Sequence, residues 1–389
     1  MSHHTVVPGL PAVMLFYLIC CLCTLEVALG LNGRALIVQN KGGGHGTIGY
    51  QLCKTLKQQH PGLQLVILQD KCNYKKPPFS SYKELESTGV KVIETSLSSP
   101  GDLSELNGMN IDYVIDNWSK NSENATFVCN IAKISKAQQY VFISSAGMYK
   151  NSNVSPLVET DPVKENDARK VEITVSSSGI PYTFLRPQYI YGPKSSKRYL
   201  DFFIGRAYRK LITPLPLHGD QLVCLTHIED VSTLIAATLG KDAAKGQIFN
   251  CGTDKYLSYK GLAKMIHIAL GNDASDMRFM YYEPKDFDKW DGSGVQEFPF
   301  RRETFITSPS KAKMLLGWTP SHRIEDHIAA DIKEYEELGG FKDKWGVEEV
   351  KYDLEIIASK DSSFTFTYPF FDDDTNINKE KRPYPFESS

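Results

Sequence analysis

The sequence predicts an α/β protein with a Rossmann-type, doubly wound parallel sheet and a smaller C-terminal substrate lobe. Short apolar segments of strand length alternate with helical segments through the first half of the 389 residues, which is the pattern of right-handed βαβ crossovers. A glycine-rich stretch directly follows the first such segment and opens a helix. After Pro187 the composition changes to Pro, Gly and basic residues, which predicts a lobe over the carboxyl edge of the sheet.

Six segments are apolar on both faces and are therefore predicted as strands buried in a parallel sheet. A helical stretch at residues 50–59 follows the first of them. Two later helices, at 261–271 and 325–338, have apolar residues at three- and four-residue spacing. The predicted strands cover residues 35–40, 63–70, 90–95, 111–117, 139–145 and 181–187.

Length and composition limit the domain organisation. Apolar residues make up 41% and charged residues 23% of the chain, as in an ordinary soluble globular protein. The net charge of −2 excludes long-range attraction to nucleic acid, so such binding would need a local patch. Cysteine spacing predicts neither a disulfide framework nor a zinc site. We expect a Rossmann domain at 31–186, a smaller lobe interleaved with it at 187–340, and a partly disordered tail at 341–389.

The N-terminus resembles a cleaved signal peptide covering residues 1–30. The apolar run at 11–25 is too short to span a bilayer comfortably, and Ala28 and Gly30 are small residues at the positions that a signal peptidase inspects. No Lys or Arg precedes the run, so a buried N-terminal helix is the alternative. We expect no stable membrane insertion after cleavage.

The glycine-rich stretch at residues 43–49 has the spacing GxxGxxG between a strand and a helix. Glycines there permit a tight turn and close approach of the backbone to a pyrophosphate, and the helix N-terminus offers N–H donors. Asp70 ends the second predicted strand, near where an adenosine ribose would lie, and slightly favours NAD over NADP. A structural turn without a ligand is the alternative. The predicted cofactor contacts in the stretch are Gly43, Gly46, Thr47, Ile48 and Gly49.

Six ordered motifs, including this stretch, resemble the extended, atypical short-chain dehydrogenase/reductases, which are similar to NAD-dependent epimerases and dehydratases. The resemblance implies cofactor contacts from Ser144 and Pro187, and a substrate-orienting role for Ser145. The other motifs are SSAGMY (144–149), LRPQYIYGP (185–193), HIEDV (227–231), IFNCG (248–252) and SKAKMLLGW (310–318).

Within that superfamily the chain most resembles the chloroplast stem-loop-binding proteins. The resemblance implies an RNA stem-loop partner, association with plastid ribosomes or transcription complexes and with related subunits, and a divalent cation if the RNA is cleaved. It places the protein in the plastid stroma, reached through an endoplasmic-reticulum signal; a secreted or lumenal protein is the alternative. The motifs are KKPPF (75–79), DNWSK (116–120), FISSAGMYK (142–150) and RPQYIYG (186–192).

The superfamily's catalytic tyrosine and lysine are missing. Hydride transfer there needs a tyrosine phenol and a lysine four residues later. Alignment on Glu172 puts Lys164 at the tyrosine position and Ala168 at the lysine position, and Lys170 is out of phase on the helix. Trp118 stands where small residues usually lie against the cofactor. Classical dehydrogenase or epimerase activity is therefore not expected.

A basic and aromatic segment at residues 194–210 is the best local candidate for RNA binding. Lysine and arginine would contact phosphates, and tyrosine would stack on unpaired bases. The alternative is an amphipathic helix whose Phe202 and Phe203 are core residues and whose charges are only solvated. The candidate residues are Lys194, Lys197, Arg198, Arg206, Arg209, Lys210, Tyr199 and Tyr208.

Acidic residues and a histidine near the expected cleft could hold a divalent cation, although none has a nuclease spacing; they are Glu159, Asp161, His227, Glu229 and Asp230.

The leading hypothesis is a plastid RNA-binding protein on a former dehydrogenase fold. A rival is a small-molecule epimerase or reductase that uses Ser145, Tyr149 and Lys170. A third is a non-catalytic subunit of a plastid assembly.

Overall fold

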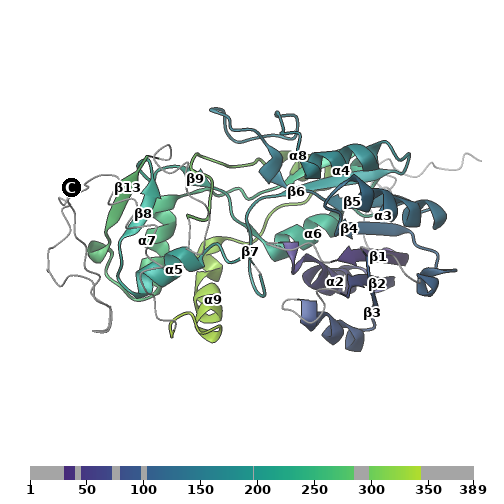
Figure 1. Ribbon diagram of the computed structural model, residues 1–389, viewed down its shortest axis with the longest axis horizontal. Coiled ribbons are helices and arrows are strands. Elements are labelled where there is room, and N and C mark those ends of the chain that lie inside the picture. Colours follow the sequence, from purple (N-terminus) through teal and green to yellow (C-terminus); the bar gives the residue numbers. More distant parts are fainter. Residues whose placement is uncertain are drawn as a thin grey trace, which may run out of the picture.

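The computed structural model describes residues 30–39, 45–71, 79–97, 103–195, 197–283 and 298–342. Its centre is a sheet of seven strands in the order β11-β6-β5-β4-β1-β2-β3, in which every neighbouring pair is parallel. The predicted fold class is confirmed (Figure 1). The strands are β1 Gly33–Gln39, β2 Leu63–Asp70, β3 Lys91–Thr95, β4 Tyr113–Asn117, β5 Gln139–Ile143, β6 Tyr182–Pro187 and β11 Gln247–Cys251.

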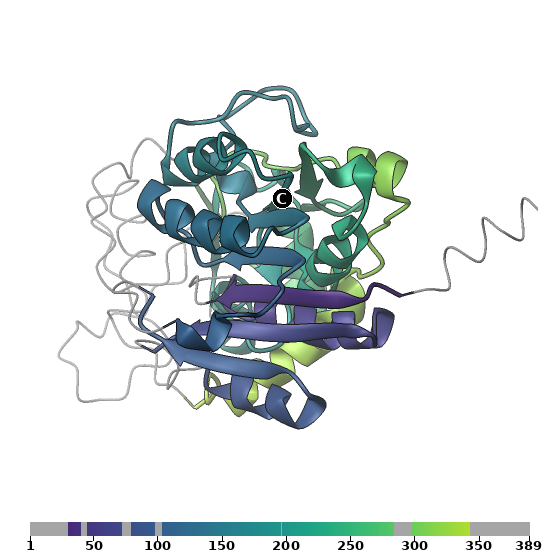
Figure 2. The ribbon, with the colours of Figure 1, turned by 90° about the vertical axis from the view of Figure 1, so that its right-hand side faces the viewer.

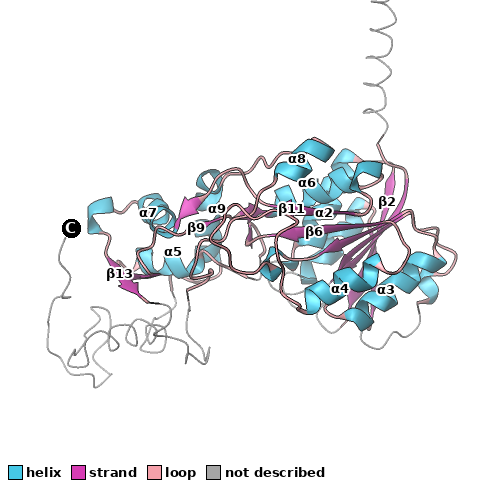
Figure 3. Ribbon diagram, turned by 90° about the horizontal axis from the view of Figure 1, so that it is seen from above, coloured by secondary structure: helices cyan, strands magenta, loops and turns pink. Residues whose placement is uncertain are grey.

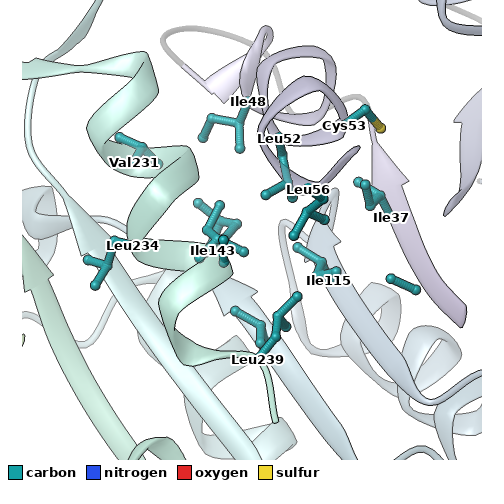
Figure 4. Packing of buried hydrophobic residues seen from close by; sticks show 14 of the residues in the cluster. Ile37, Ile48, Leu52, Cys53, Leu56, Ile115, Ile143, Val231, Leu234 and Leu239 are labelled. Carbon is teal, nitrogen blue, oxygen red and sulfur yellow. The ribbon is translucent and has the colours of Figure 1, made fainter. Parts of the chain in front are cut away.

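Helices cover both faces of the sheet, as the end view in Figure 2 and the view from above in Figure 3 show. On one face, apolar residues of α2, α6 and α8 share a core cluster with the sheet; on the other face α3 and α4 do so. Figure 4 shows Ile48 and Leu52 of α2 and Val231 and Leu234 of α6 in the first cluster. The helices are α2 Ile48–Gln59, α3 Ser122–Ile134, α4 Asp167–Ser176, α6 Ile228–Thr238 and α8 Ser310–Leu316.

A smaller lobe lies beyond the carboxyl ends of the strands (Figure 1). Its core is rich in aromatic rings, among them Phe203, Tyr259 and Phe300. Three two-stranded pairs support it: β7 with β10, β8 with β13, and β9 with β12. Its elements are β7 Ile190–Tyr191, α5 Asp201–Tyr208, β8 Thr213–Pro216, β9 Leu222–Val223, β10 Thr226–His227, β12 Leu257–Ser258, α7 Tyr259–Ala269, β13 Phe279–Tyr282 and α9 Ile324–Glu337.

Short 3₁₀ helices complete the described chain: η2 Phe79–Thr88, η3 Ser104–Leu106, η4 Ala146–Met148, η5 Asp242–Ala244 and η6 Ala274–Asp276. The predicted signal peptide, apart from Gly30, and the predicted tail after Lys342 lie outside the described residues. Within the described part of the chain, no helix combines the length and apolar character needed to cross a membrane.

Candidate functional site

The loop between β1 and α2 is held from inside the protein through one peptide carbonyl. The carbonyl oxygen of Gly46 accepts hydrogen bonds from the side-chain amide of Gln39 at 3.2 Å and from the hydroxyl of Tyr82 at 2.9 Å. Because the peptide unit is planar and trans, the N–H of Thr47 points away from this buried carbonyl. The loop therefore turns a backbone donor away from the core, as a phosphate-binding turn requires.

Gly49 brings α2 close to β1. A Cβ at this position would lie 3.0 Å from Cδ of Gln39 and 3.1 Å from the hydroxyl of Tyr82, and both neighbours are buried. A side chain there would push the helix away from the strand and disturb the bonds on Gly46. The third glycine of the pattern thus performs the close helix–strand packing predicted for it. Gly43 lies outside the described residues.

Thr47 supplies a polar group without a partner at the start of α2. It is the N-cap residue and only 2% exposed, and its Oγ1 is buried without a hydrogen-bond partner among the described residues. Buried hydroxyls are normally bonded, so this group fits a ligand acceptor such as a phosphate oxygen. Ile48, in the first turn, is fully buried and anchors the helix. These residues fit the pyrophosphate of a dinucleotide.

Asn117 links the loop to β4, and its role was missed in the sequence. Its side-chain amide donates to Oε1 of Gln39 at 2.9 Å and to the carbonyl of His45 at 2.8 Å. The carboxyl ends of β1 and β4 are thereby fixed to the loop. The available signal was a polar residue at the end of each of two apolar strands, Gln39 and Asn117, because such ends meet at one edge of a parallel sheet.

Asp70 and Trp118 lie on either side of this loop in the sheet order. Asp70 ends β2 beside Thr95 and is 6% exposed.

The expectation that Trp118 takes up cofactor space needs correction. Its indole is 6% exposed and belongs to the core cluster under α3, where its ring meets Phe127 edge to face at a centroid distance of 6.0 Å.

The helix that should bear the catalytic pair is shortened at its start. Asn166 caps α4 by accepting from the N–H of Arg169, so the helix begins at Asp167. Lys164 lies before it, exposed, with its N–H bonded to the carbonyl of Met148. Of the two aligned positions, only Ala168 lies in α4, in its first turn. The two positions that align with the dyad therefore do not share a helix.

A buried ion pair occupies the inner side of α4. Arg186 of β6 donates to both carboxylate oxygens of Glu172, at 3.0 and 2.8 Å, and the two side chains are 2% and 0% exposed. Ser144 donates its hydroxyl to the same carboxylate at 2.8 Å. The Ser144 side chain therefore faces the core, and Pro187 is buried at the end of β6. Ser144, Glu172 and Arg186 thus each have a partner inside the protein.

Tyr149 belongs to the same network. Its hydroxyl donates to Asn250 at 2.7 Å and accepts from Arg186 at 3.0 Å, and the side chain is fully buried. Burial raises the pKa of Tyr149 to about 12, against the opposing effect of Arg186. Lys170, by contrast, is exposed and paired with Asp167. The structure does not bring together the groups Tyr149 and Lys170 that a displaced acid–base pair would need.

Ser145 and the acidic candidates serve local structure. Ser145 Oγ accepts from the N–H of Gly147 at 3.0 Å. Glu159 accepts from the N–H of Asn250, and Asp161 from the N–H of Val158. These two acids have different backbone partners.

The other two candidates of that set, together with a histidine, lie at the start of α6. Asp230 is 1% exposed and accepts from the backbone N–H groups of Ser321 and His322. Burial, together with the rings of His327 and His322, lowers the pKa of His227 to about 3, so the His227 ring is neutral at physiological pH. Glu229 is part of the same group of residues, through its contact with His322 at 3.1 Å.

The arginines of the basic segment are mainly structural. Arg206 lies inside the lobe with a fully buried side chain and its guanidinium 4.3 Å from the Phe202 ring centre. Arg198 is paired with Asp201 and Glu334, both at 2.8 Å. Arg209 donates to the carbonyl of Gly340 at 2.8 Å. The predicted amphipathic helix is α5, and Phe202 and Phe203 are core residues.

The lysines of the segment are exposed and only weakly held. Lys194 lies 3.5 Å from Glu84 and Lys210 lies 3.7 Å from Asp276, while Lys197 lies over the ring of Tyr199. Such surface pairs contribute little to stability, so the ammonium groups can exchange partners. Tyr199 is stacked on Phe300 in the lobe core; Tyr208 is 47% exposed and stacked on Phe341.

The doubly wound parallel sheet and the glycine-rich loop after β1 define a Rossmann-type protein. The comparison with protein families agrees with this class. Residues 42–252 match the NAD-dependent epimerase/dehydratase family, and the chain belongs to it. Among curated proteins it is 33% identical over 221 residues to the chloroplast stem-loop binding protein of 41 kDa b from Arabidopsis thaliana, covering 56% of this chain and 57% of that protein. It is 25% identical over 207 residues to an uncharacterized UDP-glucose epimerase, YtcB, from Bacillus subtilis, covering 50% of this chain and 60% of that one.

Solved structures of nucleotide-sugar enzymes have the same fold. The dTDP-glucose 4,6-dehydratase of Bacillus anthracis in complex with NAD superposes with a TM-score of 0.61 at 15% identity, covering 78% of this chain and 97% of that one. The UDP-glucuronic acid 4-epimerase of Bacillus cereus in complex with NAD and UDP-glucuronic acid gives 0.60 at 17% identity, covering 78% and 99%.

Proposed function

We propose that the protein binds stem-loop RNA on a fold that keeps the phosphate loop of its family but has lost the hydride-transfer pair. The observation that carries this proposal is the start of α4 at Asp167, which leaves Lys164 outside the helix while the inner side is filled by the Glu172–Arg186 pair. Without a phenol and an ammonium group at this place, the acid–base step of a reductase has no donor. The stem-loop-binding name of the relative from Arabidopsis supports RNA as the ligand.

The proposed RNA surface consists of Lys194, Lys197 and Lys210 with the exposed ring of Tyr208. The three ammonium groups are free to exchange their surface contacts for phosphates, because each is exposed and none is held by a buried carboxylate. Arg198, Arg206 and Arg209 shape this surface from inside rather than contact the RNA. The proposed phosphate contacts of residues 194–210 are therefore the three lysines alone.

A salt titration tests the surface. A labelled stem-loop RNA is titrated with wild type and with the Lys194→Ala, Lys197→Ala, Lys210→Ala triple variant at several salt concentrations. Each phosphate contact contributes roughly 0.7 to 0.9 to the slope of log affinity against log salt, so the triple variant should lose about two units of slope. A wild-type slope in the folded triple variant would contradict the proposed surface.

A matched control removes the same charge elsewhere. Lys91, at the start of β3, and Lys133, in the last turn of α3, are exposed, and Lys245, just before β11, is half-buried; all three lie at the amino edge of the sheet. Replacing these three by Ala should leave the salt slope within about one unit of wild type. An equal loss in both triple variants would show that net charge, and not this surface, drives binding.

The compartment and partners follow from the same proposal. We propose the plastid stroma, reached through the signal peptide at residues 1–30, with plastid ribosomes or transcription complexes and related subunits as partners; a secretory lumen is the alternative.

A second candidate function, a small-molecule reaction on a bound dinucleotide, is favoured by one observation. The unpartnered hydroxyl of Thr47 at the start of α2 fits a pyrophosphate.

A further inference from the structure

Three histidines from distant parts of the chain meet between the two lobes. His227 ends β10, His322 precedes α9, and His327 lies in its first turns. One ring nitrogen from each residue lies within 4.8 Å of the others. We propose that His227, His322 and His327 bind a divalent transition-metal ion of the zinc class, with Glu229 as the fourth ligand.

His322 is already oriented as a metal ligand. Asp230, buried, contacts Nδ1 of His322 at 2.8 Å and accepts from its backbone N–H at 3.1 Å. A carboxylate on one ring nitrogen fixes the ring and directs the other nitrogen to a metal. The other nitrogen, Nε2, lies 3.1 Å from Oε2 of Glu229.

The separation of His322 and Glu229 fits an ion. With metal–ligand bonds of about 2.0 to 2.2 Å, two ligand atoms on a tetrahedral zinc ion lie roughly 3.4 Å apart. The observed 3.1 Å between Nε2 and Oε2 is therefore close to the distance that a bridging ion sets.

His227 also presents one nitrogen. Its Nδ1 accepts from the N–H of Glu229 at 3.4 Å, which leaves Nε2 on the far side of the ring. Gly192 lies there with a φ of +119°, and a Cβ on it would come within 2.9 Å of that Nε2. Glycine at this position keeps the nitrogen open.

A cavity leads to the cluster. It has a volume of about 420 Å³ and is lined by His227, Glu229 and His327, with Asp331 and Glu334 of α9 further along its wall. Glu229 is the acidic group of this wall nearest the rings, and Lys194 and Lys333 lie on the same wall. The cavity gives an ion a path to the rings of His227 and His327.

Binding requires the rings to turn. The His227 ring stacks on those of His322 and His327 at centroid distances of 4.5 and 4.3 Å with interplanar angles of 24°. Nitrogen lone pairs lie in the ring plane, so the nitrogens converge only after both stacks open, with His227 and His327 each turning about the last side-chain torsion. This torsion is soft, and His327 is only half-buried.

Cobalt and zinc test the site on the full chain. The chelator-treated protein is titrated with Co²⁺, whose visible absorption reports tetrahedral coordination, and the bound Co²⁺ is then displaced by Zn²⁺. We expect one ion per chain in wild type. His322→Gln and His327→Gln should each weaken Zn²⁺ binding by at least tenfold, and Glu229→Gln by a smaller factor.

His218→Gln is the matched control, because His218 is exposed and its ion pair among the described residues is with Asp220. It should bind Co²⁺ and Zn²⁺ as wild type does. Thermal unfolding without metal confirms that each variant folds, and His322→Gln and His327→Gln suffice if a His227 variant does not. The proposal is overturned if wild type binds no Co²⁺ or Zn²⁺, or if the His322→Gln, His327→Gln double variant binds them unchanged.

Discussion

The phosphate loop and the catalytic helix come from the same family site but have opposite polar surroundings. At the loop, Thr47 keeps a buried hydroxyl without a partner at the start of α2. At α4, Ser144, Glu172 and Arg186 satisfy one another inside the protein. A buried polar group without a partner fits a ligand, whereas mutually satisfied groups are typical of a structural position. We therefore propose that the chain has retained one half of the family site and converted the other.

The largest expected effect breaks the closed network. Glu172→Ala leaves the Arg186 guanidinium buried without its carboxylate, which should lower the free energy of unfolding by about 3 to 5 kcal/mol. Denaturant unfolding measures the change. Lys170→Ala, on the outer side of the same helix, is the control and should change stability by less than about 0.5 kcal/mol. Equal effects would mean that the network is not structural.

The second effect concerns the loop. In Gly49→Val the side chain would meet Gln39 and Tyr82, whose positions hold the Gly46 carbonyl. We expect a loss of about 1 to 3 kcal/mol from overpacking, together with weaker dinucleotide binding. Unfolding and calorimetry measure the two. Val at this position with unchanged stability and affinity would show that close packing of α2 on β1 is not needed.

A further effect tests whether a half-buried carboxylate in the smaller lobe is costly to ionise. Burial raises the pKa of Asp331 to about 7, with Arg198 opposing and Glu334 and Asp201 adding to it. Between the unfolded value of about 3.9 and about 7, the unfolded state holds fewer protons, so stability falls as pH rises.

Asp331→Asn should remove this decrease, so the variant gains stability relative to wild type from pH 4 to 7. Melting temperatures across this range measure the difference. Parallel curves for the two proteins would show that Asp331 titrates near its ordinary value.

The sheet was predictable because its strands are apolar on both faces. The predicted strand at 63–70 coincides with β2, and the others agree within two residues at each end. The start of α4 was not predictable from alignment on Glu172, because the Asn166 cap decides it. Arg206 was misplaced on the surface because a short amphipathic helix does not reveal which basic residue turns inward.

The histidine cluster was missed for a different reason. Cysteine and histidine spacing along the chain predicted no zinc site, since His227 and the pair His322 and His327 are brought together only by the packing of α9 beside β10. Ligands separated in this way leave no local signature. Likewise, the roles of Gln39 and Asn117 depend on their strands ending at neighbouring positions in the sheet.

Dinucleotide binding without turnover is the most direct test of a retained loop and a converted catalytic helix. Calorimetry with NAD and NADP is combined with a turnover assay on common nucleotide-sugars, with Gly46→Val as the folded variant that loses the loop. We predict that wild type binds a dinucleotide, that Gly46→Val does not, and that no nicotinamide is oxidised or reduced. Turnover at an ordinary enzyme rate of about 1 s⁻¹ that disappears in Tyr149→Phe would contradict the account.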